Sequence, residues 1–354
     1  MSDIPVYWEA DADGSLLTSM RCGGSVTYLA RPKTISELQE TLALAASRAL
    51  PIKLLGGGSN LILSDEGFSG VLVRPQFRWL RPVETDAWQN ALDLLAAQTA
   101  DGQRYRAEGT GYLALTDSQT GQGPLRLIEA GCDVAWGQLV QFSLQRHLHG
   151  LHRYARIPCK VGGAIYNNIH AAEHLLQEAV CAVQSLVPET GELLWHFQDR
   201  LDFGYDSSRF HLSGEVIVSA LFALPEVSPP NSQADAVLYR DWTAQKAAVQ
   251  PSGPNCGSVF KNLLAPAAGE NQVAAGFYVE ACGFKGRQVG GMQVYPEHAN
   301  FIVNLGNGRQ ADLIELIAQI REAVRDRFSV ELEPEAECID TMGFVHQWEK
   351  SRSV

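Results

Sequence analysis

The chain opens with short apolar runs separated by glycine-rich turns, a pattern that predicts strands joined by tight connections. A mostly apolar run occupies 52–55, and two further apolar runs follow at 61–63 and 71–73. The first two runs are separated by Gly56-Gly57-Gly58-Ser59-Asn60. Consecutive glycines permit backbone angles closed to other residues, and their N–H groups can line an anion-binding concavity. The stretch permits two interpretations, a phosphate cradle on a sheet or a tight β-connection without a ligand.

The residues before this stretch predict a strand and a helix. Residues 25–30 are mainly apolar or β-branched and predict a strand, and leucines and alanines at helical spacing predict a helix from about 34 to 50. Thr34 is the candidate N-cap, because Glu37 three residues later completes a capping box. With the glycine stretch, these elements form one β-α-β-β unit of the first 75 residues.

The middle of the chain contains a second group of predicted strands. Its polar segment at 83–124, rich in Gly, Gln and Thr, is interpreted as an insertion or a long hairpin, with a possible helix at 88–97. A glycine- and asparagine-rich stretch at 151–172 lies between apolar patches and is interpreted as a loop that packs two strands or presses against a ligand. The other expected strands are at 125–130, 180–187, 193–197 and 216–224. A helix is expected at 136–145, with its end near 147–150 and Gly150 as the C′ residue.

A break in composition at Pro225–Asp235, rich in Pro and Ser, predicts a linker before the last third of the chain. Beyond it, apolar residues at helical spacing predict a long amphipathic helix over 313–328. A shorter helix is expected at 275–282, and strands are expected at 299–303 and from 330 toward 339.

Charge and composition exclude several classes of protein. The 354 residues carry a formal net charge of −12, with a pI near 5.2, which argues against general nucleic-acid binding. Seven cysteines without a C-x-x-C pair predict neither a zinc site nor a disulfide scaffold, and they fit a reducing cytosol. No long uncharged apolar run predicts a membrane span, and the acidic N-terminus is unlike a signal peptide. His170 and His174 lack a pattern of carboxylates or cysteines to complete a metal site, so no metal is expected.

Five motifs, in order along the chain, resemble the UDP-N-acetylenolpyruvoylglucosamine reductase family. They cover nearly all of the chain except about 83–124 and the linker. The motifs are LLGGGSNLILSDEGFSGVLV at 54–73, RIPCKVGGAIYNN at 156–168, GSVFKN at 257–262, GFKGRQVGGMQVYPEHANFIVN at 283–304, and LEPE at 332–335.

The resemblance implies an α+β fold. It consists of a two-lobed FAD-binding domain of the vanillyl-alcohol-oxidase (PCMH) type and a C-terminal α+β substrate domain. The implied layout is a first FAD-binding lobe at 1–75, a second lobe at 76–224 that contains the insertion, a substrate domain at 236–340, and a C-terminal tail at 341–354.

The resemblance also implies residue roles. Ser258 matches the catalytic serine, which protonates the carbon beside the substrate carboxylate, and Glu335 matches the assisting glutamate. Basic and polar side chains that match substrate-binding positions are Tyr205, Lys261, Asn262, Lys285 and His298. Flavin-binding positions are Gly56, Gly57, Gly58, Ser59, Asn60, Leu61, Ile157, Pro158, Cys159, Gly162, Gly163, Asn168 and Ile169.

Three positions depart from the family pattern. Asp206 occupies the place of a catalytic arginine, and an ionised aspartate there would repel a substrate carboxylate. Cys159 replaces a glycine of the second flavin motif, and His170 begins a stretch that replaces Gly-Ala-Tyr-Gly. Arg156 and Lys160 are candidate replacements for the missing positive charge.

The resemblance therefore implies a cytoplasmic, monomeric enzyme that reduces UDP-N-acetylglucosamine enolpyruvate with FAD and NADPH to make UDP-N-acetylmuramate for peptidoglycan. Its partners would be a nucleotide-sugar substrate, with no nucleic acid and no membrane. Because of Asp206, two alternatives stay open. One is a divergent flavin oxidoreductase that acts on a different substrate, and the other is a flavin-binding protein without catalysis.

Overall fold

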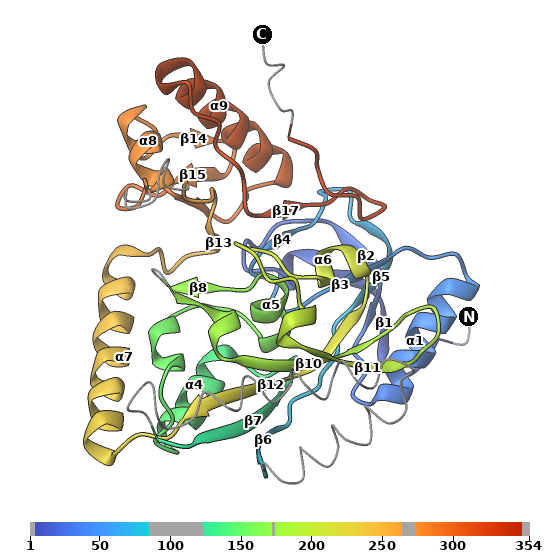
Figure 1. Cartoon of the computed structure of the whole chain (residues 1–354). Coiled ribbons are helices and arrows are strands. Elements are labelled where there is room, and N and C mark those ends of the chain that lie inside the picture. The colour runs from blue at the N-terminus through green and yellow to red at the C-terminus, as the bar shows by residue number, and fades with distance from the viewer. Residues whose placement is uncertain (1–3, 85–122, 172–173, 264–272, 349–354) are drawn as a thin grey trace. The chain divides into compact units, whose positions relative to one another are not determined.

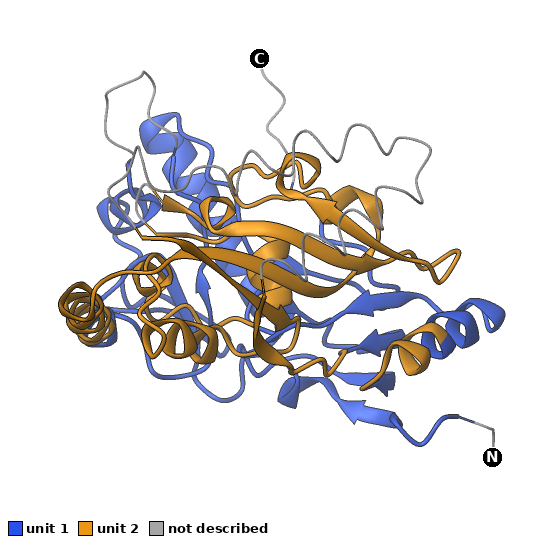
Figure 2. Ribbon diagram, turned by 60° about the horizontal axis from the view of Figure 1, so that its bottom comes forward, with its two compact units in different colours: residues 1–32, 40–74, 246–354 blue, residues 33–39, 75–245 orange. Residues whose placement is uncertain are grey.

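The structure is a computed structural model that describes residues 4–84, 123–171, 174–263 and 273–348 (Figure 1). It divides into two compact units (Figure 2). Unit 1 contains residues 1–32, 40–74 and 246–354, and unit 2 contains residues 33–39 and 75–245. The helix expected at 88–97 and most of the expected insertion lie outside the described residues.

A four-stranded sheet forms the N-terminal part of unit 1, in the order β1-β2-β5-β3. β1 (Trp8–Asp13) pairs antiparallel with β2 (Ser25–Ala30), whereas β5 (Phe68–Val73) pairs in parallel with both β2 and β3 (Ile52–Leu54). The connection from β2 to β3 contains helix α1 (Ile35–Ser47), and the predicted capping box between Thr34 and Glu37 is confirmed. The short helix η1 (Gly14–Leu16) follows β1.

The strand after the glycine stretch leaves this sheet. β4 (Leu61–Ile62) pairs in parallel with β17 (Glu337–Cys338), near the other end of the chain. The strand expected from residue 330 is therefore limited to residues 337–338, and its partner is the segment that follows Asn60. The glycine stretch thus does not join two neighbouring strands of one sheet, as the sequence pattern suggested.

The C-terminal part of unit 1 is a small antiparallel sheet with two helices. The order is β13 (Asn255–Ser258), β16 (Phe301–Asn304), β15 (Met292–Val294) and β14 (Gln288–Val289). Helices α8 (Ala275–Ala281) and α9 (Gln310–Phe328) confirm the two predicted helices. The carboxylate of Asp65 accepts hydrogen bonds from the N–H groups of Gln310 and Ala311, at 2.7 and 3.0 Å, and so caps α9.

One hydrophobic cluster links the two ends of the chain within unit 1. Met20, Cys22 and Ile62 are buried with residues of α8, α9 and the C-terminal sheet, among them Phe260 and Leu316. The sequence predicted separate domains at 1–75 and 236–340, and unit 1 contains most of both.

An antiparallel five-stranded sheet forms unit 2, in the order β11-β10-β12-β7-β6. The hairpin of β10 and β11 and the long central strand β12 confirm the predicted strands. The bounds are β6 Leu80–Val83, β7 Leu125–Gly131, β10 Val180–Leu186, β11 Leu193–Phe197 and β12 Val216–Pro225.

The remaining elements of unit 2 are mostly short. The longer helices are α4 (Trp136–Leu144) and α7 (Pro229–Val249). The short elements are η2 (Leu151–Tyr154), α5 (Val161–Tyr166), β8 (His170–Ala171), β9 (His174–Leu175), η3 (Leu176–Glu178), η4 (Gln198–Arg200) and α6 (Phe210–Ser213).

Three sequence predictions about unit 2 are wrong. α4 ends at Leu144, and Gly150 instead precedes η2 with a φ of +116°. The stretch expected as a glycine loop contains helix α5, because Gly162 and Gly163 adopt helical geometry there. The expected linker at 225–235 is the end of β12 and the first turns of α7.

Helices combined with mostly antiparallel and some mixed sheets confirm the predicted α+β class. Among the helices of the described residues, none is long and apolar enough to cross a membrane.

Candidate active site

The glycine stretch at 56–60 presents an unusual run of backbone donors in unit 1. Among the described residues, no acceptor takes a hydrogen bond from the N–H groups of residues 56–60. The loop is anchored instead by its carbonyl groups, since Ser19 N–H donates to Gly58 O at 2.8 Å. Backbone N–H groups rarely stay unpaired away from water unless a ligand or solvent accepts from them. This run of donors fits the phosphates of a flavin dinucleotide.

Gly58 is the glycine of this loop for which the structure shows a steric requirement. Its φ is +72°, and a Cβ atom there would lie 2.3 Å from the carbonyl oxygen of Leu17. Both the backbone angle and the close approach exclude a larger residue. The loop shape therefore depends on this glycine.

Three predicted site segments meet in unit 1, although they lie far apart in the sequence. The side-chain amide of Asn60 donates to Glu335 O at 3.2 Å, and the Glu335 N–H donates to Val259 O at 2.9 Å. Asn60 O in turn accepts from Glu337 N–H at 2.9 Å. These bonds bring the glycine loop, the segment after Ser258 and the LEPE motif together.

A β-bulge shapes the strand that carries Ser258. In β13, Asn255 pairs with Val303 and Ser258 pairs with Phe301, so β13 has one extra residue between these pairs. Gly257 occupies the bulge with a φ of +84°, and its N–H donates to the Asn255 side chain at 2.9 Å. Such a bulge changes the direction of the side chain that follows it. Here that residue is Ser258, which is partly buried.

The Glu335 carboxylate lies close enough to the Ser258 strand to influence a neighbouring thiol. Burial first, and the charge of Glu335 second, raise the pKa of Cys256 to about 12. Cys256 precedes Ser258 by two residues in β13. The structure therefore brings both predicted catalytic residues to one region of unit 1, and the Cys256 thiol stays neutral there.

The predicted substrate residues after Ser258 differ in how firmly they are held. The Lys261 ammonium lies 2.7 Å from the Glu333 carboxylate, whose side chain is 71% exposed. The Asn262 side-chain oxygen accepts from Ala275 N–H at 3.2 Å, at the start of α8. Lys261 can exchange an exposed partner for a ligand, whereas the Asn262 oxygen already caps a helix.

Lys285 and His298 lie near each other in unit 1. Lys285 pairs with Glu280 at 2.8 Å. Burial lowers the pKa of His298, and the ammonium of Lys285 lowers it further. The imidazole of His298 is therefore neutral near pH 7, beside a cation that pairs with the half-exposed carboxylate of Glu280.

The second predicted flavin segment, in unit 2, uses most of its own backbone donors. The N–H groups of Val161 and Gly162 donate to Val134 O and Cys132 O, at 3.0 and 2.9 Å. Those of Cys159, Ala164, Asn167, Asn168 and Ile169 also find acceptors within unit 2. Gly163 is different, because a Cβ atom there would meet nothing within 4 Å. A ligand can therefore approach the backbone of this segment most readily at Gly163.

Cys159 and Lys160 in this segment are also accounted for. Burial raises the pKa of Cys159 to about 12, so its thiol is neutral at physiological pH. The Lys160 ammonium donates to Asp133 O at 3.0 Å and lies 3.3 Å from the Asp133 carboxylate. Lys160 thus neutralises a buried aspartate, and this argues against Lys160 as the replacement for the arginine that is missing at residue 206.

Asn168 is fully buried, and its side chain bonds to other parts of unit 2. Its amide donates to the Gln177 side chain at 3.1 Å and to Gly204 O at 2.9 Å, and its oxygen accepts from Gln177 N–H at 2.9 Å. These bonds connect the second flavin segment to the loop that contains Tyr205 and Asp206. The amide expected at a flavin edge is thus committed to positioning that loop.

Two of the three departures from the family pattern are in contact. Asp206 Oδ1 lies 3.3 Å from His170 Nδ1, and the hydroxyl of Tyr205 lies 3.3 Å from His170 Nε2. The rings of His170 and Tyr205 also pack with centroids 4.7 Å apart. Sequence reasoning missed this contact, because residues 170 and 206 belong to different short elements and no periodicity relates them.

Arg209, three residues after Asp206, is already held by other groups of unit 2. Arg209 donates to the Glu215 carboxylate at 2.8 Å and to Arg200 O at 3.0 Å. Arg156 is exposed and makes no hydrogen bond or ion pair with the part of the chain that the structure describes. Of the candidate replacements, Arg156 therefore remains as a source of positive charge in unit 2.

Comparison with known proteins gives one consistent result. A family model described as the C-terminal domain of UDP-N-acetylenolpyruvoylglucosamine reductase matches residues 249–339. The UDP-N-acetylenolpyruvoylglucosamine reductase of Trichormus variabilis is 31% identical over 327 residues, which cover 92% of this chain and 84% of that protein. The one from Moorella thermoacetica is 31% identical over 90% of this chain and 89% of its own.

A solved structure of a protein with the same name as these relatives is also similar to this chain. The crystal structure of UDP-N-acetylenolpyruvylglucosamine reductase (MurB) from Thermus caldophilus superposes with a TM-score of 0.65. It is 24% identical and covers 92% of this chain and 97% of that one. This likeness confirms the fold that the sequence motifs implied.

Proposed function

Because the chain belongs to the UDP-N-acetylenolpyruvoylglucosamine reductase family, we propose that it reduces UDP-N-acetylglucosamine enolpyruvate to UDP-N-acetylmuramate, with FAD as cofactor and NADPH as hydride donor. This reaction supplies a precursor of peptidoglycan. The proposal includes a nucleotide-sugar substrate, a cytoplasmic location and a monomeric enzyme. The observation that carries it is the meeting of Asn60, the Ser258 strand and Glu335 in unit 1.

The backbone of residues 56–60 is the part of the chain that best fits FAD. Its N–H groups lack acceptors among the described residues, and they would donate to the phosphates of the cofactor. Gly163 in unit 2 offers a second place where the cofactor could approach the backbone closely. When bound, FAD supplies a hydride, received from NADPH, to the vinyl carbon of the enolpyruvyl group.

Ser258 provides the proton that completes the reduction. Hydride addition leaves an electron pair on the carbon beside the substrate carboxylate, and the Ser258 hydroxyl donates its proton to that carbon. The bulge at Gly257 sets the direction of this side chain. Glu335 lies next to the same strand and assists the proton transfer.

The cations of unit 1 hold the nucleotide sugar. Lys261 and Lys285 each pair with a carboxylate that is more than half exposed, Glu333 and Glu280. Such surface pairs contribute about 0–1 kcal/mol each, so a diphosphate can displace the carboxylates at little cost. His298, neutral and next to Lys285, is available to hydrogen-bond the sugar nucleotide.

A comparison of two serine variants tests the reaction. Ser258→Ala should lower turnover of the enolpyruvyl substrate by about 100-fold or more while FAD stays bound. Ser252→Ala, which changes an exposed serine just before the same strand, should leave turnover unchanged. The measurement is NADPH oxidation that depends on the enolpyruvyl substrate. A wild-type protein that binds FAD but shows no such oxidation would contradict the proposal.

The contact between Asp206 and His170 favours a second candidate function. The resemblance implies a positive charge at residue 206, but this chain has a carboxylate there that lies against an imidazole. The same flavin chemistry could then serve an acceptor without the enolpyruvyl carboxylate. In the first candidate, Arg156 would supply the positive charge in place of an arginine at residue 206.

Replacing both His170 and Asp206 distinguishes the two candidate functions. The double variant Asp206→Arg with His170→Gly restores the residues that the family pattern has at these positions. If the chain acts on another substrate, the variant should gain reductase activity on the enolpyruvyl substrate. A large loss of that activity would instead show that the His170–Asp206 pair serves the first candidate reaction.

A further inference from the structure

Helix α7 of unit 2 is long, but its buried residues are polar. It contains 21 residues, and the two that are buried are Ser232 and Asp235. Its apolar residues Val237 and Leu238 are 38% and 41% exposed. A surface helix usually docks through an apolar stripe, and the buried positions of α7 do not form one. The buried contacts of α7 are therefore polar, and they are made by Asp235 and by Ser232, whose hydroxyl donates to Leu144 O at 3.2 Å.

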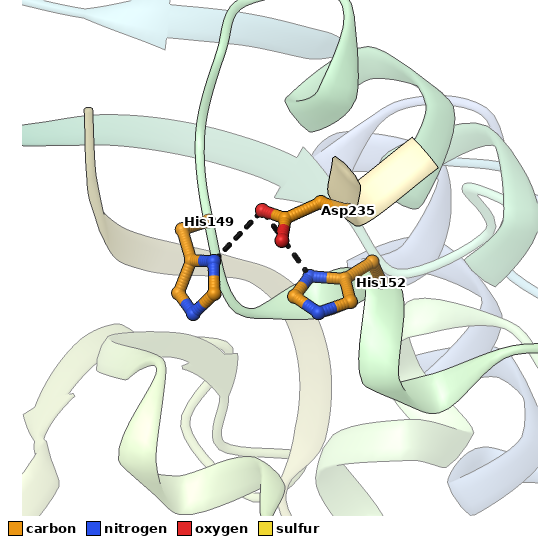
Figure 3. A group of neighbouring side chains, drawn as sticks. All are labelled: His149, His152 and Asp235. Carbon is orange, nitrogen blue, oxygen red and sulfur yellow. Dashed lines mark hydrogen bonds and ion pairs between the residues drawn. The ribbon is translucent and has the colours of Figure 1, made fainter. Parts of the chain in front are cut away.

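Asp235 meets two histidines that lie close together in sequence. Its Oδ2 atom lies 2.7 Å from His149 Nδ1 and 3.6 Å from His152 Nδ1 (Figure 3). The donor atoms of the three side chains all lie within 4.8 Å of one another. Figure 3 shows the Nδ1 edges of both rings turned toward the carboxylate. His149 lies just before η2, and His152 lies within it.

The nitrogen of His152 that faces this cluster has no hydrogen-bond partner. His152 is 2% exposed, and its Nδ1 atom is buried without a bond. The ring stacks on Trp242 of α7, with centroids 5.9 Å apart and planes at 10°, so its orientation is held by packing. An unpaired buried nitrogen is unfavourable, and a ligand on that nitrogen would satisfy it.

The charges of the cluster fit a bound cation. Asp235 is 6% exposed, and an isolated buried carboxylate is costly unless a positive charge accompanies it. Imidazole nitrogens are common ligands of such cations.

We propose that His149, His152 and Asp235 bind a divalent transition-metal ion, and zinc is the expected ion. The bound ion would fasten α7 to the segment that contains η2. Two imidazoles and one carboxylate are a ligand set suited to zinc, whereas calcium and magnesium prefer oxygen ligands. Donors at ordinary zinc distances, arranged as a tetrahedron, lie about 3.3 Å apart. The separations of Asp235 Oδ2 from the two histidine nitrogens, 2.7 and 3.6 Å, bracket that value, and all three donor atoms lie within 4.8 Å of one another.

Arg153 is the nearby group that opposes a cation. Its Nη2 atom lies 3.4 Å from His149 Nε2, and its Nη1 atom lies 3.0 Å from both ring nitrogens of His174. His174 also contacts the exposed carboxylate of Glu178 at 3.2 Å. A guanidinium this close weakens the binding of a metal ion. The site should thus bind zinc reversibly rather than permanently.

Metal titration of the chelator-treated full chain tests the proposal. The expected result is one Zn²⁺ or Co²⁺ per chain that Asp235→Asn abolishes. Saturating zinc should raise the midpoint of thermal unfolding of the wild type by roughly 4 °C. His147→Asn, which alters an exposed histidine just before the cluster, should bind zinc as the wild type does.

Two further variants keep the test decisive if Asp235→Asn does not fold. His149→Gln, at a partly exposed position, should weaken zinc binding by about tenfold or more. Arg153→Gln should tighten it by about threefold or more, because the opposing charge is removed. A wild type that binds no zinc, or variants that all bind it equally, would overturn the proposal and leave a hydrogen-bonded cluster only.

Discussion

Two glycine-rich segments, one in each unit, look alike in sequence but differ in their backbone hydrogen bonds. The segment at 56–60 leaves its N–H groups without acceptors among the described residues, whereas the segment at 157–169 uses most of its own. The first segment offers donors to a ligand. The second offers mainly shape, through α5 and the open space beside Gly163. Glycine content alone therefore does not tell which segment binds phosphate, because that depends on where the backbone donors go.

The same two units differ in how they follow the family pattern. Unit 1 contains Ser258 and Glu335, which match the catalytic motifs. Unit 2 contains all three departures, Cys159, His170 and Asp206. The departures from the family pattern are thus concentrated in the unit whose flavin segment has few free donors. If this chain has changed its substrate, we expect the cause to lie in unit 2.

The largest effect is expected from Gly58→Ala in unit 1. A Cβ atom would meet Leu17 O at 2.3 Å in a backbone with a φ of +72°, so the loop must move. We expect a loss of about 3–4 kcal/mol of folding stability and the loss of bound FAD. Urea unfolding and the visible absorbance of the flavin measure both.

Gly253→Ala is the matched control for this change. A Cβ atom at Gly253 meets nothing within 4 Å, so stability and FAD content should not change. If Gly58→Ala retained FAD and stability as fully as Gly253→Ala, the loop would not depend on the geometry described here.

Asn168→Ala should have the next largest effect, and it acts on unit 2. The change leaves the N–H of the partly buried Gln177 without its acceptor, and it removes one of the two hydrogen bonds that the carbonyl of Gly204 accepts. We expect a loss of about 3 kcal/mol, measured by urea unfolding. Asn167→Ala, at the neighbouring and less buried residue, should leave stability nearly unchanged. Equal stability of the two variants would contradict the positioning role of Asn168.

Gly163→Ala sharpens the comparison, because stability and cofactor binding should respond in opposite directions. The residue is inside α5 with open space at its Cβ position, so alanine should raise folding stability by up to about 1 kcal/mol. If FAD approaches the backbone here, its affinity should fall at the same time. An unchanged flavin affinity would remove Gly163 from the proposed flavin site. Calorimetric unfolding and flavin titration supply the two measurements.

The smallest effect concerns the thiol of Cys159. Burial raises its pKa to about 12, so only a small fraction is thiolate at pH 8, and its alkylation by iodoacetamide should be slow. The rate should increase as the pH rises toward 12, because the thiolate is the reactive form. Peptide mapping of the alkylated protein measures it. Fast labelling at neutral pH would show that the segment is more open than the structure indicates.

Much of the local structure could be predicted because it depends on neighbouring residues. The capping box at Thr34 and Glu37, the hairpin of β10 and β11, and the amphipathic helix α9 all follow from residues a few positions apart. The failures have the same explanation. The polar, proline-rich start of α7 was expected to be a linker, because its polar residues give no apolar period and its docking partners lie elsewhere in the chain.

The candidate site divides in the same way. The motifs identified Ser258, Glu335 and the glycine loop, but not the hydrogen bonds by which Asn60 and Glu335 join them. Asn168 was expected at a flavin, and its amide instead holds the loop of Gly204. A side chain's role depends on its hydrogen-bond partners, and these partners come from segments distant in sequence.

The sequence by itself determined the α+β class, most of the helices and strands, and the family motifs, because each depends on short-range patterns or on a local order of residues. Only the tertiary structure decided that β4 pairs with β17, that Asp206 lies against His170, and that Asp235 lies between two histidines. Each of these contacts joins segments far apart in the chain. Local propensity does not encode such contacts, since they form only when burial of the shared core brings the segments together.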